Sequence, residues 1–328
     1  MTAAADPLLL NNTFPMSHSV LGTMAFGDTV SAVTAHEMVA AALDAGVTGV
    51  DTANGYAGGE SERILGEMMP TIRDRVILAT KAGIPHPDAG EAAPLSREGI
   101  GRCLEGSLKR LKTDSVDLFY LHQPDRRTPL EETLSAIAEL QLEGRIRAYG
   151  VSNFAAWQLV DLCRLADAMG VARPAMAQQL FNLVARRLED EYFEAAALFE
   201  IPTMVYNPLG GGLLTGTHHF ADRPSDGRFG SSRLASMYGE RYWSEGIFDA
   251  IGQLRAAAER EGTTLQEFSL RWLRHHDGVD AVLVGGSRIE HIASNLAALQ
   301  APPLSASGIA VCEDVGAQLR GPMPTYNR

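Results

Sequence analysis

Four side chains with acid–base chemistry stand at the ends of apolar runs that are typical of buried strands. The run VTGV at residues 47–50 leads into Asp51 and, past a turn, Tyr56, while Lys81 and His122 close or follow two later runs. An unpaired ammonium group at the end of a buried strand is costly, so Lys81 needs a partner, and Asp51 is the natural one. A carboxylate, a phenol, an ammonium and an imidazole in one place would suit proton transfer to a substrate oxygen.

Reduction of a carbonyl group is a reaction that uses all four side chains. Hydride addition to an aldehyde builds negative charge on the oxygen, which needs a proton donor and a preorganised electrostatic site. A tyrosine hydroxyl has an ordinary pKa of about 10 and is a weak acid at neutral pH, but a nearby cation lowers that pKa. We therefore predict that Lys81, oriented by Asp51, tunes Tyr56 as the general acid, while His122 orients the carbonyl oxygen.

Two other interpretations of these residues stay open. Asp51 and Lys81 could form a purely structural ion pair, with Tyr56 on an ordinary loop and His122 satisfied in the core. Alternatively, a desolvated Lys81 could be the Schiff-base nucleophile of a lyase. Trapping of a substrate on Lys81 with borohydride would support the lyase, whereas pairing with Asp51 predicts no adduct.

The segments that position these residues alternate between strand-like and helix-like patterns. Polar residues follow the strands at positions 51, 81, 122, 152, 178 and 206, so the spacing is 26 to 41 residues, the length of a strand–helix unit. Strands are expected at 19–21, 47–51, 75–81, 116–121, 146–151, up to about 178, 202–206 and 281–284. Helices are expected at 34–45, 61–69, 96–111, 128–144, 155–169, 189–199, 247–260, 265–275 and 288–299, after an arm or short hairpin in residues 1–19.

Eight strands in alternation with helices predict an α/β fold, a single (β/α)8 TIM barrel domain over residues 1–328 with a long loop after the seventh strand and a C-terminal tail. A doubly wound sheet is less favoured, because no G-x-G-x-x-G follows the first strand. The carboxyl ends of parallel barrel strands converge on one face. Asp51 and His122 would therefore meet although 71 residues separate them.

Composition excludes several classes of function. The 328-residue chain has a net charge of −12, which argues against a nucleic-acid surface because phosphate binding needs concentrated Lys and Arg. It has no run of about 18 apolar residues and no basic-then-apolar leader, so we expect a soluble cytoplasmic protein without a membrane span. Cys103, Cys163 and Cys312 are expected to be reduced packing thiols. The histidine pairs at 218–219 and 275–276 lack ligand spacing, and we expect no metal site.

At these residues the sequence resembles the aldo-keto reductases. The matching pieces occur in order: GTM at 22–24, VDTANGY at 50–56, ATK at 79–81, DLFYLHQPD at 117–125, GVSNF at 150–154 and YNPLGGGLLTG at 206–216. Other pieces are similar to one branch, the aflatoxin-aldehyde and succinic-semialdehyde reductases: SLKRLKTDSVDLFYLH, TPLEETL, SNFAAWQL, and MYGERYW at 237–243. The last residues, PTYNR, resemble that branch's Pro-x-Tyr-x-Arg terminus.

The resemblance implies an NADPH-dependent reductase of small carbonyl compounds, in which Asp51, Tyr56, Lys81 and His122 match the catalytic tetrad. It also implies a set of cofactor-binding residues. The matching positions are Gly22, Thr23, Met24, Asp51, Ser152, Asn153, Gln178, Tyr206, Asn207, Pro208, Leu209, Gly211, Leu213, Gly285, Ser287, Arg288, His291 and Asn295.

Within that set, the resemblance assigns different parts of the cofactor to different groups. Ser152, Asn153 and Gln178 match the residues that bind the nicotinamide carboxamide. Tyr206 matches the aromatic residue that stacks on the nicotinamide ring, and the loop 207–213 corresponds to the cover of the diphosphate.

The segment 285–295 corresponds to the adenosine and 2′-phosphate site. Ser287 and Arg288 precede a predicted helix, where an anion gains from free N–H groups and a guanidinium. A capped helix with a solvated arginine is the other interpretation. His291 stands where glutamine is usual and Thr217 where lysine is usual, so the adenosine and diphosphate contacts depart from the branch pattern.

Met24, Phe26 and Trp243 are candidates for the substrate wall, beside the tetrad tyrosine and histidine. Residues 28–29 are Asp and Thr where the branch carries arginines, which weakens the case for a carboxylate-bearing substrate. Arg328 could still supply a positive charge.

A sensing subunit is the second functional class that the resemblance allows. Potassium-channel β-subunits resemble the same family and hold the cofactor chiefly as a redox sensor. Rapid multiple-turnover consumption of NADPH with a simple aldehyde would favour the enzyme. The branch also contains dimers, so a homodimer is possible for this chain by analogy alone.

Overall fold

The computed structural model describes residues 8–10 and 14–322, which fall into two compact units. The first, the barrel unit, comprises the residues up to Gln179, Leu188–Tyr206 and Gly278–Ala293. The second, the helical unit, comprises Leu180–Arg187, Asn207–Asp277 and the residues from Ser294 onward. A single domain over residues 1–328 stays a prediction.

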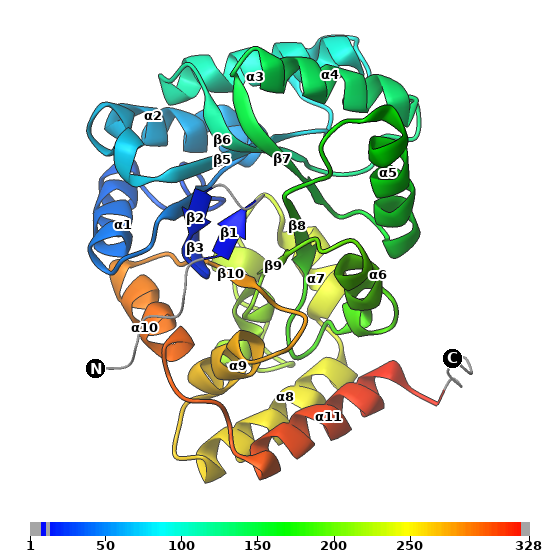
Figure 1. Ribbon diagram of the computed structural model, residues 1–328. Helices are drawn as coiled ribbons and strands as arrows, with labels where there is room; N and C mark the ends of the chain where they lie inside the picture. Colours follow the sequence, from blue (N-terminus) through cyan, green and yellow to red (C-terminus); the bar gives the residue numbers. More distant parts are fainter. Residues whose placement is uncertain (1–7, 11–13, 323–328) are drawn as a thin grey trace. The chain divides into compact units, whose positions relative to one another are not determined.

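Eight parallel strands form a closed barrel in the order β10-β3-β4-β5-β6-β7-β8-β9 (Figure 1). The strands are β3 (Ser19–Gly22), β4 (Gly49–Asp51), β5 (Ile77–Ala82), β6 (Val116–Leu121), β7 (Ile146–Ser152), β8 (Met176–Leu180), β9 (Thr203–Tyr206) and β10 (Ala281–Val284). Each lies within a few residues of a predicted strand. The closed ring confirms the (β/α)8 TIM barrel.

Helices of the barrel unit follow its strands and surround them (Figure 1). They are α1 (Ala32–Asp44), α2 (Glu60–Ile72), α3 (Arg97–Leu111), α4 (Leu130–Leu142), α5 (Ala156–Met169) and α6 (Tyr192–Leu198). α10 (Ile289–Leu299) follows β10, and its residues divide between the two units. The strands are covered by helices on the outside, which explains why they read as continuous apolar runs.

Strand register brings the polar residues to one end of the barrel. Asp51 pairs with Gly22 on one side and Ala79 on the other, and Lys81 lies two residues past Ala79 in β5. Ser152 pairs with Gln178 at the matching ends of β7 and β8. The predicted convergence of strand ends is therefore a direct consequence of parallel pairing.

The two short strands that precede the barrel form an antiparallel pair, β1 (Leu8–Leu10) with β2 (Phe14–Met16), in agreement with the predicted hairpin. Met16 is 2% exposed and packs with core residues of the barrel, among them Val20 and Leu118. This pair therefore contributes to the interior of the barrel.

Two predicted helix starts need correction. α1 begins after Ser31, whose hydroxyl accepts from the main-chain N–H of Thr34, so the cap lies three residues before the predicted start at Thr34. α4 begins after Pro129, without a side-chain cap. Thr128, where the predicted helix starts, instead donates its hydroxyl to Asp125 at 2.9 Å, since the carboxylate is the stronger acceptor.

The helical unit contains α7 (Ala235–Tyr242), α8 (Glu245–Arg260), α9 (Leu265–Arg274) and α11 (Ala306–Arg320). The expected long loop after the seventh barrel strand thus contains α7, and the expected C-terminal tail contains α11. Ser305 caps α11 by accepting from the main-chain N–H of Gly308. None of the helices in residues 8–10 and 14–322 is long and apolar enough to cross a membrane.

Candidate active site

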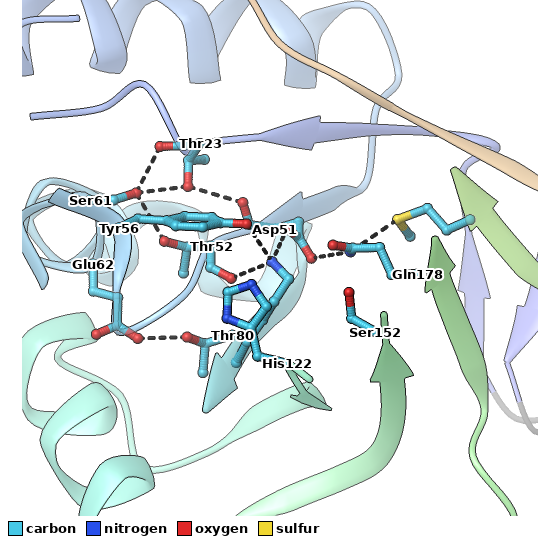
Figure 2. Close-up of polar contacts among 12 residues, drawn as sticks. Thr23, Asp51, Thr52, Tyr56, Ser61, Glu62, Thr80, His122, Ser152 and Gln178 are labelled. Carbon is cyan, nitrogen blue, oxygen red and sulfur yellow. Dashed lines mark hydrogen bonds and ion pairs between the residues drawn. The ribbon is translucent and has the colours of Figure 1, made fainter. Parts of the chain in front are cut away.

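The ammonium group of Lys81 is fully buried near the end of β5 and donates to three oxygens (Figure 2). Its Nζ bonds to a carboxylate oxygen of Asp51, to the main-chain oxygen of Thr52 at 2.7 Å and to the hydroxyl oxygen of Tyr56 at 3.2 Å. An ammonium group has three N–H donors, so these contacts use its full capacity. The structure brings the three tetrad residues together, and their catalytic roles stay a prediction.

The carboxylate of Asp51 is also fully buried, and each of its oxygens has a donor. One oxygen accepts from Lys81, and the other accepts from the side-chain amide of Gln178 at 2.9 Å. The same amide nitrogen lies 3.5 Å from the sulfur of Met204. Sequence reasoning assigned Gln178 to the cofactor and missed its contact with Asp51, because 127 residues separate the two.

The charge of Lys81 is stabilised by its neighbours. Burial alone would lower the pKa of the Lys81 ammonium, but the carboxylate of Asp51 and the phenol of Tyr56 more than offset that effect, so the pKa lies above its ordinary value. Lys81 is therefore charged at neutral pH. A buried ion pair of this kind depends on both partners, because removal of one leaves an uncompensated charge.

Tyr56 begins a short 3-10 helix, Tyr56–Gly59, that runs into α2, and its side chain is half-buried. The Lys81 Nζ lies 4.8 Å from the centre of the Tyr56 ring. The ring of His122 meets it edge-on, with centroids 5.9 Å apart and an interplanar angle of 81°. The phenol, the ammonium and the imidazole thus lie side by side.

His122 follows β6 and has a neutral imidazole. Burial, together with the positive charge of Lys81, lowers the pKa of His122 from 6.5 to about 3. Its Nδ1 is buried and has no hydrogen-bond partner among the described residues. A neutral imidazole carries one N–H, so His122 can donate a single hydrogen bond to a substrate oxygen but is no cationic acid at neutral pH.

Acid is expected to destabilise the protein through His122. The unfolded chain takes up a proton near the ordinary pKa, whereas the folded protein resists it down to a pKa of about 3. Between these two pKa values the unfolded state therefore binds more protons than the folded state. The contribution of His122 to stability is fully present above about pH 6.5, and as the pH falls below that value it decreases by at most about 1.4 kcal/mol per pH unit. His122→Gln should flatten the decline in urea-unfolding free energy between about pH 6.5 and about pH 4.5; an equally steep decline would assign it to other groups.

Ser152, Asn153 and Tyr206 form a connected polar group at the ends of β7 and β9. The Asn153 amide donates to the Ser152 hydroxyl at 3.1 Å and to the main-chain oxygen of His122 at 2.8 Å, and it accepts from the Tyr206 hydroxyl at 2.7 Å. The backbone of Asn153 is left-handed, with φ 61°, which asparagine tolerates. These donors and acceptors, with the amide of Gln178, match the chemistry of a carboxamide ligand.

A second polar group lies at the start of α10. The main-chain N–H of Ser287 donates to His291 Nδ1 at 3.3 Å, and the guanidinium of Arg288 lies 3.3 Å from His291 Nε2. Burial and the charge of Arg288 lower the pKa of His291. Ser287 and Arg288 are both exposed, so a hydroxyl and a guanidinium that lie beside His291 also face solvent ahead of a helix, where they can meet an anion.

Predicted cofactor residues in the helical unit lie in the loop 207–213, except for Asn295, which lies in α10. The Asn207 side chain accepts from the main-chain N–H of Gly211 at 2.6 Å, and its backbone is left-handed with φ 59°. A Cβ at Gly211 would lie 2.7 Å from the Tyr238 ring, so glycine is required there. Asn295 is buried and accepts from the amide of Gln266 at 2.7 Å.

The residues predicted to line the substrate site differ in how far their side chains are exposed. Met24 is half-buried, but Phe26 is fully buried and presents no surface to a ligand. Trp243, in the helical unit, donates from its indole to the main-chain oxygen of Phe220 and packs against Phe248, with ring centroids 4.9 Å apart. Arg328 lies outside the described residues.

Comparison with known proteins agrees with this geometry. The sequence matches the Aldo/keto reductase family over residues 20–317. The chain belongs to this family. It is therefore an aldo-keto reductase-type oxidoreductase, and the predicted resemblance to that family is confirmed.

The relatives of this aldo-keto reductase include enzymes and a channel subunit. It is 38% identical over 305 residues to human "Aflatoxin B1 aldehyde reductase member 2", covering 88% of this chain and 84% of the relative. It is 38% identical over 301 residues to human "Aldo-keto reductase family 7 member A3", covering 87% and 89%. It is 30% identical over 286 residues to a "Probable voltage-gated potassium channel subunit beta" of Oryza sativa subsp. japonica, covering 85% and 86%.

Sequence reasoning missed several residues that surround the tetrad of this aldo-keto reductase. Thr52 contributes a main-chain oxygen to Lys81, and no side-chain pattern signals such a contact. Ser61, Glu62 and Thr80 are fully buried polar residues next to the site. The available signal was the GGESE run at residues 58–62, which places a serine and a glutamate at the start of an amphipathic helix.

Proposed function

We propose that this aldo-keto reductase reduces aldehydes and ketones to alcohols with NADPH, using Tyr56 as the general acid. The observation that supports this most is the 3.2 Å contact between Lys81 Nζ and the Tyr56 hydroxyl, made by an ammonium that Asp51 and Thr52 hold in place. A cation at that distance favours the phenolate that remains after proton transfer. The relative named "Aflatoxin B1 aldehyde reductase member 2" agrees with a carbonyl substrate.

Each tetrad residue has a distinct part in the proposed reaction. A bound nicotinamide cofactor supplies a hydride to the carbonyl carbon. Tyr56 donates its hydroxyl proton to the carbonyl oxygen as negative charge develops there, which completes the alcohol, and Lys81 stabilises the resulting phenolate. His122 donates a hydrogen bond from its neutral imidazole to the same oxygen and so orients it. Asp51 keeps Lys81 charged and in place.

The cofactor assignment rests on the two polar groups of the barrel unit. Ser152, Asn153 and Gln178 offer the donors and acceptors that a nicotinamide carboxamide needs, and Tyr206 offers a half-buried ring beside them. Arg288 offers an exposed guanidinium for a 2′-phosphate, which would favour NADPH over NADH.

The channel-subunit relative supports a second candidate, a redox-sensing subunit that binds the cofactor with slow turnover. A Schiff-base lyase is less favoured, because the three acceptors around Lys81 hold its nitrogen as an ammonium, which is no nucleophile. The tetrad geometry alone suits both a reductase and a sensor. Turnover rate separates these two functions.

The test follows NADPH absorbance with a panel of 2-carboxybenzaldehyde, succinic semialdehyde, methylglyoxal and plain aromatic aldehydes, with NADH in parallel. We expect rapid multiple turnovers with at least one aldehyde and a higher kcat/KM with NADPH than with NADH. Binding of NADPH without multiple turnover on any aldehyde would favour the sensor. Equal use of NADH would remove the proposed role of Arg288.

A further inference from the structure

The first turn of α2 carries two polar residues, Ser61 and Glu62, whose side chains are fully buried. Buried polar side chains are nearly always hydrogen-bonded, because an unpaired one costs stability. Figure 2 shows both residues directed toward the strand ends that carry the tetrad. Their partners therefore indicate what this turn holds in place.

Ser61 connects α2 to two strand ends. Its hydroxyl donates to the main-chain oxygen of Thr23 at 2.9 Å, and it lies 2.8 Å from the Thr23 hydroxyl and 2.9 Å from the Thr52 hydroxyl. The Thr23 hydroxyl donates in turn to the main-chain oxygen of Asp51 at 2.9 Å. One serine thus fixes the ends of β3 and β4 behind Asp51. Thr23, predicted to bind cofactor, has its hydroxyl in this network.

Glu62 connects α2 to a third strand and to a neighbouring helix. One carboxylate oxygen accepts from the Thr80 hydroxyl at 2.6 Å, and the other accepts from the Nε of Arg110 at 2.7 Å. Arg110, on α3, also donates to Asp88 at 2.7 Å. The Glu62 side chain is 0% exposed and that of Arg110 is 13% exposed, so this ion pair is shielded from water.

Two glycines let α2 approach α3 closely enough for the ion pair to form. A Cβ at Gly59 would lie 2.8 Å from the Arg110 Cδ, and a Cβ at Gly66 would lie 2.1 Å from the Arg110 main-chain oxygen. A larger residue at Gly66 would push the helices apart, and one at Gly59 would displace the Arg110 side chain. The close approach keeps Glu62 within reach of Arg110.

The network leads directly to the contact between Lys81 and Tyr56. The main-chain oxygen of Thr52 accepts from Lys81 Nζ at 2.7 Å, so the residue that Ser61 holds is itself a ligand of the ammonium. Thr80 precedes Lys81 in β5, and since side chains alternate along a strand, its hydroxyl faces α2 while Lys81 faces the barrel interior. Tyr56 lies in the 3-10 helix that runs into α2. The first turn of α2 thus fixes both ends of this contact.

We propose that Ser61 and Glu62 are positioning residues that hold the Lys81 ammonium within hydrogen-bonding distance of the Tyr56 hydroxyl. The inference rests on the proposed role of Tyr56 as general acid. The attraction between an ammonium and a phenolate falls with distance, and a hydrogen bond weakens beyond its normal range. Loss of either anchor therefore weakens phenolate stabilisation without removing a group that touches substrate or cofactor.

The test compares the pH dependence of kcat for Ser61→Ala, Glu62→Gln and Thr80→Val with that of the wild-type chain. Tyr56 must be protonated to act as an acid, so kcat falls at high pH along an alkaline limb. With Lys81 less well held, we expect this limb to move up by about 1 pH unit and the plateau kcat to fall roughly tenfold. The Kd for NADPH should stay within about twofold of wild type. Thr80→Val removes the contact of Glu62 with β5 but keeps the Glu62–Arg110 ion pair. It therefore tests the same anchor if Glu62→Gln fails to fold.

Ser107→Ala is the matched control. It also removes one fully buried hydroxyl, from α3, and this hydroxyl has no hydrogen-bond partner in the part of the chain that the structure describes. We expect its alkaline limb and plateau kcat to equal those of wild type. A second readout needs no turnover: the ultraviolet phenolate titration of each variant, compared with the same variant carrying Tyr56→Phe, isolates the ionisation of Tyr56.

The outcomes distinguish the inference from the proposed function. A shifted limb in the three variants, with an unmoved limb in Ser107→Ala, supports positioning by Ser61 and Glu62. Lower melting temperatures with an unmoved limb in all three would mean a structural role alone and would overturn it. If the wild-type chain turns over no aldehyde, the proposed function fails, and the phenolate titration still decides whether these residues position Lys81.

Discussion

Replacing Tyr56 with phenylalanine is expected to lower kcat for aldehyde reduction roughly a thousandfold, with less than about a threefold change in the Kd for NADPH. The change removes the one hydroxyl that lies 3.2 Å from Lys81 Nζ and faces the imidazole of His122. His122 cannot replace it as an acid, because its pKa is lowered to about 3. The measurement is the steady-state decay of NADPH absorbance at saturating cofactor and aldehyde.

Tyr149→Phe is the control for this substitution. It also removes a phenol hydroxyl from a buried tyrosine of the barrel, and that hydroxyl donates to the main-chain oxygen of Ala172 at 3.1 Å, away from the tetrad. We expect the control to retain its turnover. Near-normal turnover in Tyr56→Phe would remove Tyr56 from the role of general acid.

Replacing Lys81 with methionine is expected to give the largest loss of stability, about 3 to 5 kcal/mol, because it leaves the Asp51 carboxylate buried without a counter-charge. Burial raises the pKa of Asp51. In this variant the folded state therefore holds a proton that the unfolded state releases, so the stability that remains is greatest at low pH and is lost as pH rises. Urea unfolding of Lys81→Met and wild type at about pH 5 and about pH 8 should show that the variant loses more unfolding free energy at the higher pH.

A second substitution separates stability from catalysis at the same site. Adding Asp51→Asn to Lys81→Met removes the buried charge while keeping a side chain of similar size. We expect the double variant to recover much of the lost stability and none of the lost reductase activity. Equal instability of the single and double variants would show that the ion pair is not the source of the loss. Recovery of activity would remove Lys81 from the mechanism.

The tetrad could be predicted from sequence because barrel topology is periodic. Asp51, Lys81 and His122 follow strand-like runs at the spacing of strand–helix units, and parallel pairing then brings strand ends together whatever their separation in the chain. Tyr56 comes shortly after Asp51, on the other side of a turn. Residue types at strand ends were therefore enough to predict the contact between Lys81 and its two neighbours.

The contacts that hold the tetrad were not predictable from sequence in the same way. The Thr52 contact uses a main-chain oxygen, and the Gln178 contact with Asp51 joins strands that are 127 residues apart. Ser61 and Glu62 look like ordinary first-turn residues of a helix until their burial is known. Such contacts depend on side-chain packing. Residue types and their spacing carry little information about that packing.

Two helices were also missed, for local reasons. α7 has few aliphatic residues and a glycine, so its apolar face consists of Tyr238 and Tyr242. α11 has a weak apolar face in sequence, because Cys312 and two glycines supply much of its buried surface. Tertiary packing, and not helical periodicity, determines both of these elements.

The most direct measurement of the central claim follows the transferred hydrogen. NADPH deuterated at C4 of the nicotinamide is incubated with an aldehyde that the wild-type chain consumes, and the alcohol is analysed by mass spectrometry. Hydride reduction predicts one deuterium bound to the carbinol carbon in wild type and almost no labelled alcohol with Tyr56→Phe over the same time. An alcohol without deuterium, or equal labelled product from both chains, would contradict the account.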